Sequence, residues 1–140
     1  MRGDNYVEFL TENLPDVLED LPLHVRETMW FQHDGAPPHS SRRAKQYLDI
    51  TFPNSWIGRG GPVVWPARSS NFNPLDYFLW GHLKNLIYQN PVESLEDLEK
   101  QLYNAIATIT SKMVQRAQDN LLRRANMCIQ MDGLHFEHML

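Results

Sequence analysis

The sequence has very little of several features that mark whole classes of protein. Its 140 residues include one cysteine, Cys128, so no disulfide can form within the chain. No run of apolar residues approaches the roughly 20 that cross a bilayer as a helix. The first residues, Met1 to Phe9, lack the apolar region of a secretory signal peptide. We therefore expect an intracellular protein with no disulfide framework and no membrane span.

The composition that is present indicates a folded domain with an uneven charge distribution. Hydrophobic residues make up 42% of the chain and charged residues 21%, which is typical of a globular protein. The formal net charge of −4 argues against a nucleic-acid binder. However, residues 35–90 carry a balance of +4, between residues 1–34 at −6 and residues 91–140 at −2. Two interpretations remain open: a basic face for a polyanion, or a chance distribution of charge.

Apolar residues at helical spacing predict most of the chain to be helical. The first such segment, Tyr6 to Leu21, is interrupted by Pro15, so we expect a kink or two short helices there. Further helices are expected over Ser40–Phe52 with a cap at Ser40 or Ser41, over Pro74–Gln89 after a cap at Asn73, from a cap at Ser94, and from Thr110 or Ser111 to a stop at Gly133.

Two short segments predict strands, at about residues 29–33 and 62–65, and residues 53–61 between them predict a loop. A helix connects the two strands, so they are expected to be parallel and adjacent. A two-stranded parallel sheet is not a plausible whole domain, because parallel strands need more neighbours and both faces covered. The expected fold class is therefore α/β and incomplete: two parallel strands flanked by helices, followed by C-terminal helices.

The ends of both predicted strands carry polar side chains that could bind a metal ion. Asp34 follows the first strand, and ligands of open α/β sheets bind beyond the carboxyl ends of the strands. An Asp before Gly35 is also a common turn residue, so both roles remain open. The matching position after the second strand holds Asn71 rather than a carboxylate. The flanking His33 and His39 have no metal-site spacing, and we expect them to be hydrogen-bonding surface residues.

Three segments resemble mariner-type transposases of the Tc/mariner superfamily. Trp30 to His39 reads WFQHDGAPPH, which is similar to the family's second-aspartate motif. Trp65 to Gly81 reads WPARSSNFNPLDYFLWG, which is similar to its third-acid motif of Trp-Pro-Pro-Arg-Ser-Pro-Asp-Leu followed by a helix that begins Pro-Leu-Asp. The tail from Asp132 to His138 is similar to the way that many insect members end. The segments occur in the family's order over nearly the whole chain.

The resemblance implies a ribonuclease H-like fold in which three acidic residues bind two divalent metal ions, Mg²⁺ or Mn²⁺. Two such ions stabilise the attacking and leaving oxygens of a phosphodiester during strand transfer. Asp34 matches the second acid. Asn71 stands at the third-acid position, with 36 residues between the two. An amide oxygen brings no charge, so metal binding is expected to be weak or absent.

The resemblance also implies that these 140 residues correspond to the back half of a catalytic domain. The family's first acid, its first strands and its DNA-binding helix-turn-helix modules lie upstream of the matched segments. We expect residues 1–140 to form a single partial domain, with residues 91–140 as a helical C-terminal extension. The degenerate Asn71 and the missing first acid predict that the chain does not cleave DNA by itself, although the family's activity would be DNA transposition.

The resemblance implies that the partner is DNA, contacted through its backbone without sequence preference, in the nucleus or cytoplasm. The candidate phosphate contacts are Arg42, Arg43, Lys45, Arg59 and Arg68. Trp56 and Trp65 are expected to anchor the core or a loop rather than to stack on bases. Two alternatives remain open: a helical interaction module that uses the apolar stripe of residues 94–131, including a homodimer, and a transposon remnant with no function.

Overall fold

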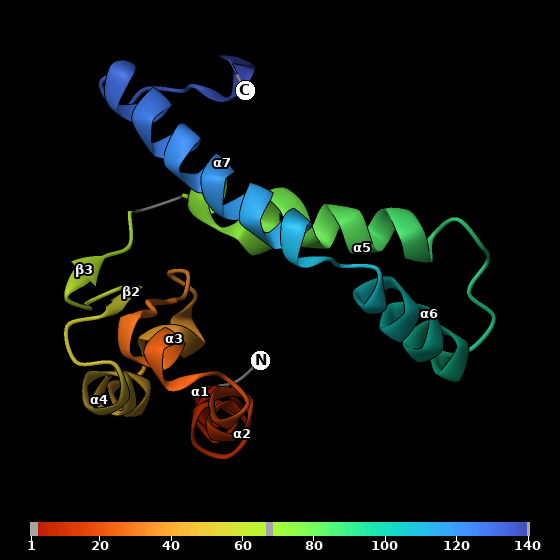
Figure 1. Ribbon diagram of the computed structural model, residues 1–140, viewed down its shortest axis with the longest axis horizontal. Helices are drawn as coiled ribbons and strands as arrows, with labels where there is room; N and C mark the ends of the chain where they lie inside the picture. The colour runs from red at the N-terminus through yellow and green to blue at the C-terminus, as the bar shows by residue number, and fades with distance from the viewer. Residues whose placement is uncertain (1–2, 67–68, 140) are drawn as a thin grey trace. The chain divides into compact units, whose positions relative to one another are not determined.

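The computed structural model describes residues 3–66 and 69–139, and the chain divides into two compact units at Ser69 and Ser70 (Figure 1). The first unit contains α1 (Gly3–Glu8), the π-helical turn η1 (Phe9–Asn13), α2 (Leu14–Glu19), α3 (Leu23–Thr28), β1 (Phe31–Gln32), the 3-10 turn η2 (Pro37–Ser40), α4 (Arg42–Thr51), β2 (Trp56–Gly58) and β3 (Val63–Val64). The second contains the 3-10 turn η3 (Ser70–Phe72), the π-helical turn η4 (Leu75–Leu79), α5 (Trp80–Ile87), α6 (Leu95–Ala107), α7 (Ser111–Gln130) and the 3-10 turn η5 (Glu137–Met139).

The first unit is built on a parallel sheet in the order β1-β2-β3. Phe31 pairs with Trp56, and Ile57 pairs with Val63. The α/β class and the parallel direction of the strands are thus confirmed. The predicted loop over residues 53–61 is wrong, because it contains β2, and β2 separates the two strands that were expected to be adjacent. The first predicted strand is also too long, because the structure has it only at Phe31–Gln32.

The connection from β2 to β3, Arg59 to Pro62, is far shorter than a usual parallel crossover. This short connection is long enough because the strands have only two or three residues. After Gly58 the chain has to return by only about one residue before it begins the next parallel strand. Gly60, at φ 80°, takes the left-handed backbone conformation in this turn, and Gly61 N donates to Gly58 O at 3.1 Å.

The core of the first unit joins the N-terminal helices to α4 and the sheet. Leu10, Leu48 and Trp56 are fully buried in it, with other apolar residues around them. The expected helix of residues 6–21 is present over residues 3–19 as α1, η1 and α2, whose backbone is continuously helical, with a π-helical turn rather than a break before Pro15. Ser41 caps α4 by accepting a hydrogen bond from Ala44 N at 3.2 Å, as one of the two predicted caps.

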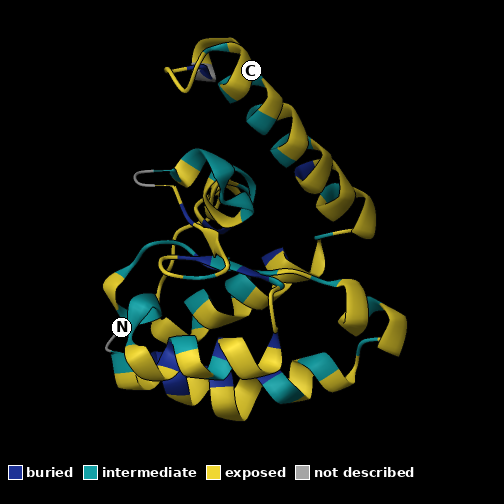
Figure 2. Cartoon of the chain, turned by 90° about the vertical axis from the view of Figure 1, so that its left-hand side faces the viewer, coloured by how far each residue is buried: buried dark blue, intermediate teal, exposed yellow. Residues whose placement is uncertain are grey.

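The second unit is helical, and its element starts follow the predicted caps. Asn73 Oδ1 accepts from Leu75 N, Ser94 Oγ accepts from Asp97 N, and Thr110 Oγ1 accepts from Met113 N. The apolar side of α6 packs on α5 around Leu83 and Ile87. Helix α7 ends at Gln130, and Gly133, the expected stop, follows it in the left-handed conformation with φ 79° and donates its amide to Cys128 O. Much of α7 is exposed (Figure 2).

Candidate metal and nucleic-acid site

Asp34 lies just beyond the carboxyl end of β1, at the edge of the sheet where the sequence predicted a site. His33 N donates to Ile57 O at 3.0 Å, which carries the β1–β2 pairing up to the residue before Asp34. A Cβ on Gly35 would lie 3.6 Å from Trp65 Cδ1, so the turn after Asp34 packs on the residue that follows β3. The carboxyl ends of parallel strands share one edge, and this edge therefore carries Asp34, Arg59 and Trp65.

The Asp34 carboxylate is held by its own turn. Its Oδ1 atom accepts a hydrogen bond from Ala36 N at 2.9 Å, which is the geometry of an Asx turn. The same atom lies 2.6 Å from His39 Nδ1, close enough for an ion pair but without the alignment of a hydrogen bond. The Asp34 side chain remains 40% exposed, so solvent and cations can reach it. Both roles that the sequence left open, turn residue and cation ligand, are thus compatible with its position.

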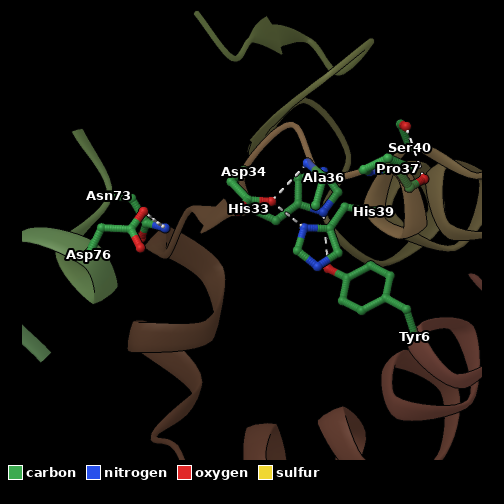
Figure 3. Close-up of polar contacts among 9 residues, drawn as sticks. All are labelled: Tyr6, His33, Asp34, Ala36, Pro37, His39, Ser40, Asn73 and Asp76. Carbon is green, nitrogen blue, oxygen red and sulfur yellow. Dashed lines mark hydrogen bonds and ion pairs between the residues drawn. The ribbon is translucent and has the colours of Figure 1, made fainter. Parts of the chain in front are cut away.

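Three rings lie next to Asp34 and form an aromatic cluster of Tyr6, His33 and His39 (Figure 3). Tyr6 Oη and His33 Nδ1 are 3.0 Å apart and hydrogen-bonded. The His33 and His39 rings are stacked at 5.3 Å and nearly parallel, and Tyr6 lies 4.2 Å from His39, centre to centre. His33 is 7% exposed, so the expectation that it is a surface residue is wrong.

The aromatic cluster changes the proton affinities of its members. Burial lowers the pKa of His33 to about 4, helped by the positive charges of His39 and Lys45 and opposed by the charge of Asp34. Burial also raises the pKa of the Tyr6 hydroxyl, and the negative charge of Asp34 adds to this shift. At neutral pH both groups are therefore uncharged. Because a neutral imidazole accepts a hydrogen bond at one of its two nitrogens, His33 Nδ1 can accept from the Tyr6 hydroxyl.

Gly58 leaves the space that His33 occupies. A Cβ at this position would overlap His33 Nε2 and would lie 2.8 Å from the Trp56 ring. No side chain larger than hydrogen fits there unless these two rings move. His33 Nε2 is buried against this backbone and has no hydrogen-bond partner within the described part of the chain. The site edge thus depends on a glycine that the sequence alone marked only as a loop residue.

Asn71 lies in the second unit, in the turn η3. Its side-chain Oδ1 is 3.4 Å from Ser70 Oγ, and its backbone carbonyl accepts a hydrogen bond from Arg124 Nη1 at 3.3 Å. Phe72, the next residue, packs on the buried ring of Phe136 near the C-terminus. Contacts from α7 and from the tail therefore fix the backbone of the third-acid position, and sequence reasoning did not find Arg124.

Across residues 3–66 and 69–139, no three His, Cys, Asp or Glu side chains come together as a metal-binding group. Asp34 is the one carboxylate among the predicted metal ligands, and Asn71 supplies only neutral oxygens. These residues therefore do not fit the ligand set of a complete two-ion site. That Asp34 and Asn71 share one ion remains a prediction.

Three of the predicted phosphate contacts lie in the first turn of α4. Arg42 and Arg43 are exposed, and Lys45 is half-buried near His33 and the turn at Gly60. Arg43 has Asp4 at 3.9 Å, an exposed pair of little energetic weight. Arg59 is exposed in the turn between β2 and β3. Arg68 lies outside the described residues.

The fold of the chain is similar to solved structures of a transposase catalytic domain. No family model and no curated protein matches the chain. A structure of the Mos1 transposase catalytic domain with raltegravir and manganese matches with a TM-score of 0.80 at 24% identity, over 98% of this chain and 66% of that one. The corresponding structure with magnesium gives 0.79 at 24% identity over 98% and 66%. The catalytic domain of Mos1 mariner transposase gives 0.78, again at 24% identity, over 97% and 64%.

The matched structures agree with the architecture that the sequence predicted. This chain spans just under two thirds of the Mos1 domains that it matches, which agrees with the expected incomplete ribonuclease H-like fold. None of the described helices is both long enough and apolar enough to span a membrane. The chain therefore has, over nearly its whole length, the fold of part of the catalytic domain of Mos1 mariner transposase.

Proposed function

We propose that the chain is a fragment of a mariner-type transposase that binds the phosphate backbone of nucleic acid and does not cleave it. The fold and the two motifs around Asp34 and Asn71 support the ancestry. The observation that carries the binding function is the basic first turn of α4, with Arg42, Arg43 and Lys45. The same proposal covers a single partial domain over residues 1–140, with residues 91–140 as its helical extension, in the nucleus or cytoplasm.

The basic turn is unfavourable for α4 by itself. The N-terminal end of a helix carries a partial positive charge, so basic side chains there are repelled and acidic ones are preferred. The first turn of α4 holds no acidic residue. Of its three basic side chains, only that of Arg43 has a carboxylate partner within the described part of the chain, Asp4 at 3.9 Å. A bound phosphate would be attracted by both the side chains and the helix end. The arrangement thus favours an anion that the isolated chain does not supply.

We expect the double variant Arg42→Gln/Arg43→Gln to bind a DNA duplex about tenfold more weakly than the natural chain at about 0.1 M salt. Loss of two phosphate contacts should also reduce the slope of log affinity against log salt by about 0.9 for each contact. The measurement is fluorescence anisotropy of a labelled duplex over a salt series. The matched control is Lys84→Gln/Lys100→Gln, which removes the same charge from exposed positions on α5 and α6. Equal losses in both variants, or binding that ignores salt, would contradict the proposal.

Cleavage is not expected, because the chain matches only one carboxylate of the three that the family uses. Two divalent ions repel one another, and several carboxylates are needed to hold them together. Asp34 supplies one charge, and Asn71 supplies none. Electrostatic stabilisation of the transition state is usually the largest catalytic contribution, so its loss removes most of the rate.

The variant Asn71→Asp is expected to bind Mg²⁺ on the order of tenfold more tightly than the natural chain, because it adds a carboxylate charge. Arg124, held against the Asn71 carbonyl, opposes the cation and keeps the gain small. Isothermal titration calorimetry with MgCl₂ measures it. Neither form is expected to nick supercoiled plasmid in Mg²⁺ or Mn²⁺. Nicking by the natural chain that disappears in Asp34→Ala would show that the fragment is an active nuclease.

A second candidate is a helical interaction module that forms homodimers. Leu122 and Ile129, seven residues apart on α7, are 67% and 73% exposed. Residues at this spacing lie on one face of a helix, where they could contact a second copy. Sedimentation equilibrium distinguishes the two functions: an assembly module self-associates without DNA, and its association weakens in Leu122→Gln, whereas a DNA-binding fragment remains monomeric until DNA is added.

A further inference from the structure

Helix α7 is the most basic helix of the second unit. It carries Lys112, Arg116, Arg123 and Arg124 against a single acidic residue, Asp119, whereas the chain as a whole has a net charge of −4. Arg116, Asn120 and Arg124 follow one another at intervals of four residues and therefore share one face of the helix. We call these three residues the Arg116–Arg124 face. The charge balance of the C-terminal 50 residues hides it, because α6 is acidic.

Arg124 is oriented over a polar pocket. Its guanidinium carbon lies 4.3 Å from the centre of the Tyr77 ring, and Nη1 donates to the Asn71 carbonyl at 3.3 Å. The pocket has a volume of about 290 Å³ and is lined by Ser70, Asn71, Asp76, Tyr77 and Arg124. Arg124 Nε is buried without a hydrogen-bond partner, and within the described residues Arg124 makes no ion pair with a carboxylate. Arginine carries five N–H donors, and its hydrogen bonds to the described residues use Nη1 alone, so donor capacity on the guanidinium remains for an acceptor at this pocket.

Arg116 lines a second pocket on the same face, about two helical turns before Arg124. This pocket has a volume of about 310 Å³, and its polar lining residues are Tyr77, Arg116 and Asn120. Tyr77 belongs to both pockets, and its hydroxyl donates to Ala117 O at 2.7 Å, which fixes the ring against α7. At about 1.5 Å per residue, the Cα atoms of Arg116 and Arg124 are about 12 Å apart along the helix. The held Arg124 and the exposed Arg116 thus border adjoining hollows.

We propose that the Arg116–Arg124 face binds the phosphate groups of a nucleic-acid backbone, with one phosphate at the Arg124 pocket and another at Arg116. Arginine donates several hydrogen bonds in a planar arrangement that matches phosphate oxygens. Ser70 and Asn71 add neutral donors at the first pocket. The inference rests on the proposed nucleic-acid binding and deepens it, because it assigns contacts to the helical second unit that the basic middle of the sequence did not indicate.

Asp76 allows the opposite change to be tested, because removing its negative charge should strengthen phosphate binding at the Arg124 pocket. Its carboxylate lines the Arg124 pocket and accepts a hydrogen bond from Asn73 Nδ2 at 3.0 Å. A negative charge at this position repels a phosphate, so the variant Asp76→Asn is expected to bind nucleic acid about threefold more tightly. Arg124→Gln and Arg116→Gln are each expected to bind roughly five- to tenfold more weakly, with a smaller salt slope.

The experiment uses the full chain, a labelled single-stranded oligonucleotide and a labelled duplex, and fluorescence anisotropy at several salt concentrations. Arg123→Gln is the matched control, because it removes the same charge from the same helix at an exposed position outside both pockets. Circular dichroism melts show whether each variant folds. If Arg124→Gln does not fold, Arg116→Gln carries the test, because its side chain is exposed.

The proposal is supported if both pocket variants lose more affinity than Arg123→Gln and if Asp76→Asn gains affinity. It is overturned if the three arginine variants lose affinity equally, since the effect is then general charge alone. It is also overturned if vesicles containing phosphatidylserine bind with the same pocket dependence, because the surface would then recognise membranes. Failure of the chain to bind any nucleic acid overturns the proposed function itself. Loss in the Arg42→Gln/Arg43→Gln variant with none in the pocket variants overturns only this inference.

Discussion

Replacing Trp56 with alanine is expected to lower the free energy of unfolding of the first unit by about 3–5 kcal/mol. Trp56 is fully buried at the start of β2 and belongs to the core cluster that joins α1, α2 and α4 to the sheet. Its indole Nε1 donates to Asp49 Oδ1 at 3.0 Å, and its ring meets His33 edge to face. The substitution removes the largest fully buried side chain and leaves a cavity that this small unit cannot refill.

Urea unfolding followed by far-UV circular dichroism measures this change, with Trp30→Ala as the control. Trp30 lies just before β1 in the same unit, but it is 53% exposed, so its removal should cost less than about 1 kcal/mol. The comparison separates burial from the loss of a tryptophan as such. Similar destabilisation in both variants would mean that Trp56 does not form the centre of the core.

The strand that contains Trp56 shows where the sequence prediction failed. The rule that a strand–helix–strand segment gives parallel neighbours is correct here, but the neighbours are β1 and β2, joined through α4. Residues 56–58 were predicted as loop because only Trp56 and Ile57 are apolar and Pro53 and Gly60 lie close on either side. The pairing of β2 comes from burial of Trp56 and from backbone bonds to β1, and neither leaves a periodic pattern in so short a segment.

The helix ends could be predicted because their causes are local. Ser94 and Thr110 each accept a hydrogen bond from an amide three residues later, and Gly133 adopts a positive φ. The surroundings of Asp34 could not be predicted in the same way. Tyr6 reaches His33 across 27 positions of sequence, and on its own it was only one apolar residue of a predicted helix.

The basic surface of the second unit also could not be predicted from the sequence. Counting charges in blocks of sequence gave a basic middle and an acidic C-terminal part. Arg116 and Arg124 are seen to share a face of α7 only when the helical repeat is applied to its observed bounds, and their pockets depend on Tyr77, which lies far earlier in the chain. Composition therefore left a polyanion partner open without locating this second basic surface.

The second prediction with a large expected effect is a loss of stability on acidification that depends on His33. The pKa of His33 is lowered to about 4 in the folded chain by burial, with smaller contributions from His39 and Lys45, whereas an unfolded histidine titrates near about 6.5. Between these two values the unfolded chain binds a proton that the folded chain does not bind. The contribution of neutral His33 to the free energy of unfolding is therefore fully present above about pH 6.5. It is lost progressively as the pH decreases to about 4, by about 3 kcal/mol in all.

The measurement is the free energy of unfolding of the natural chain and of His33→Gln at about pH 7.5 and about pH 4.5. The introduced glutamine can still accept the hydrogen bond from Tyr6 but does not titrate, so the stability of the variant should change less between the two pH values, by about 2–3 kcal/mol. Titratable groups far from position 33 contribute equally to both proteins and cancel in the comparison, so the difference reports on His33 together with the His39 and Asp34 beside it. The same pH dependence in both proteins would contradict a neutral buried His33. The expected difference has a structural cause. A proton on His33 would place a further positive charge against Lys45 and His39 in a buried position, and the His33 ring is packed so closely against Gly58 that it has little room to move away.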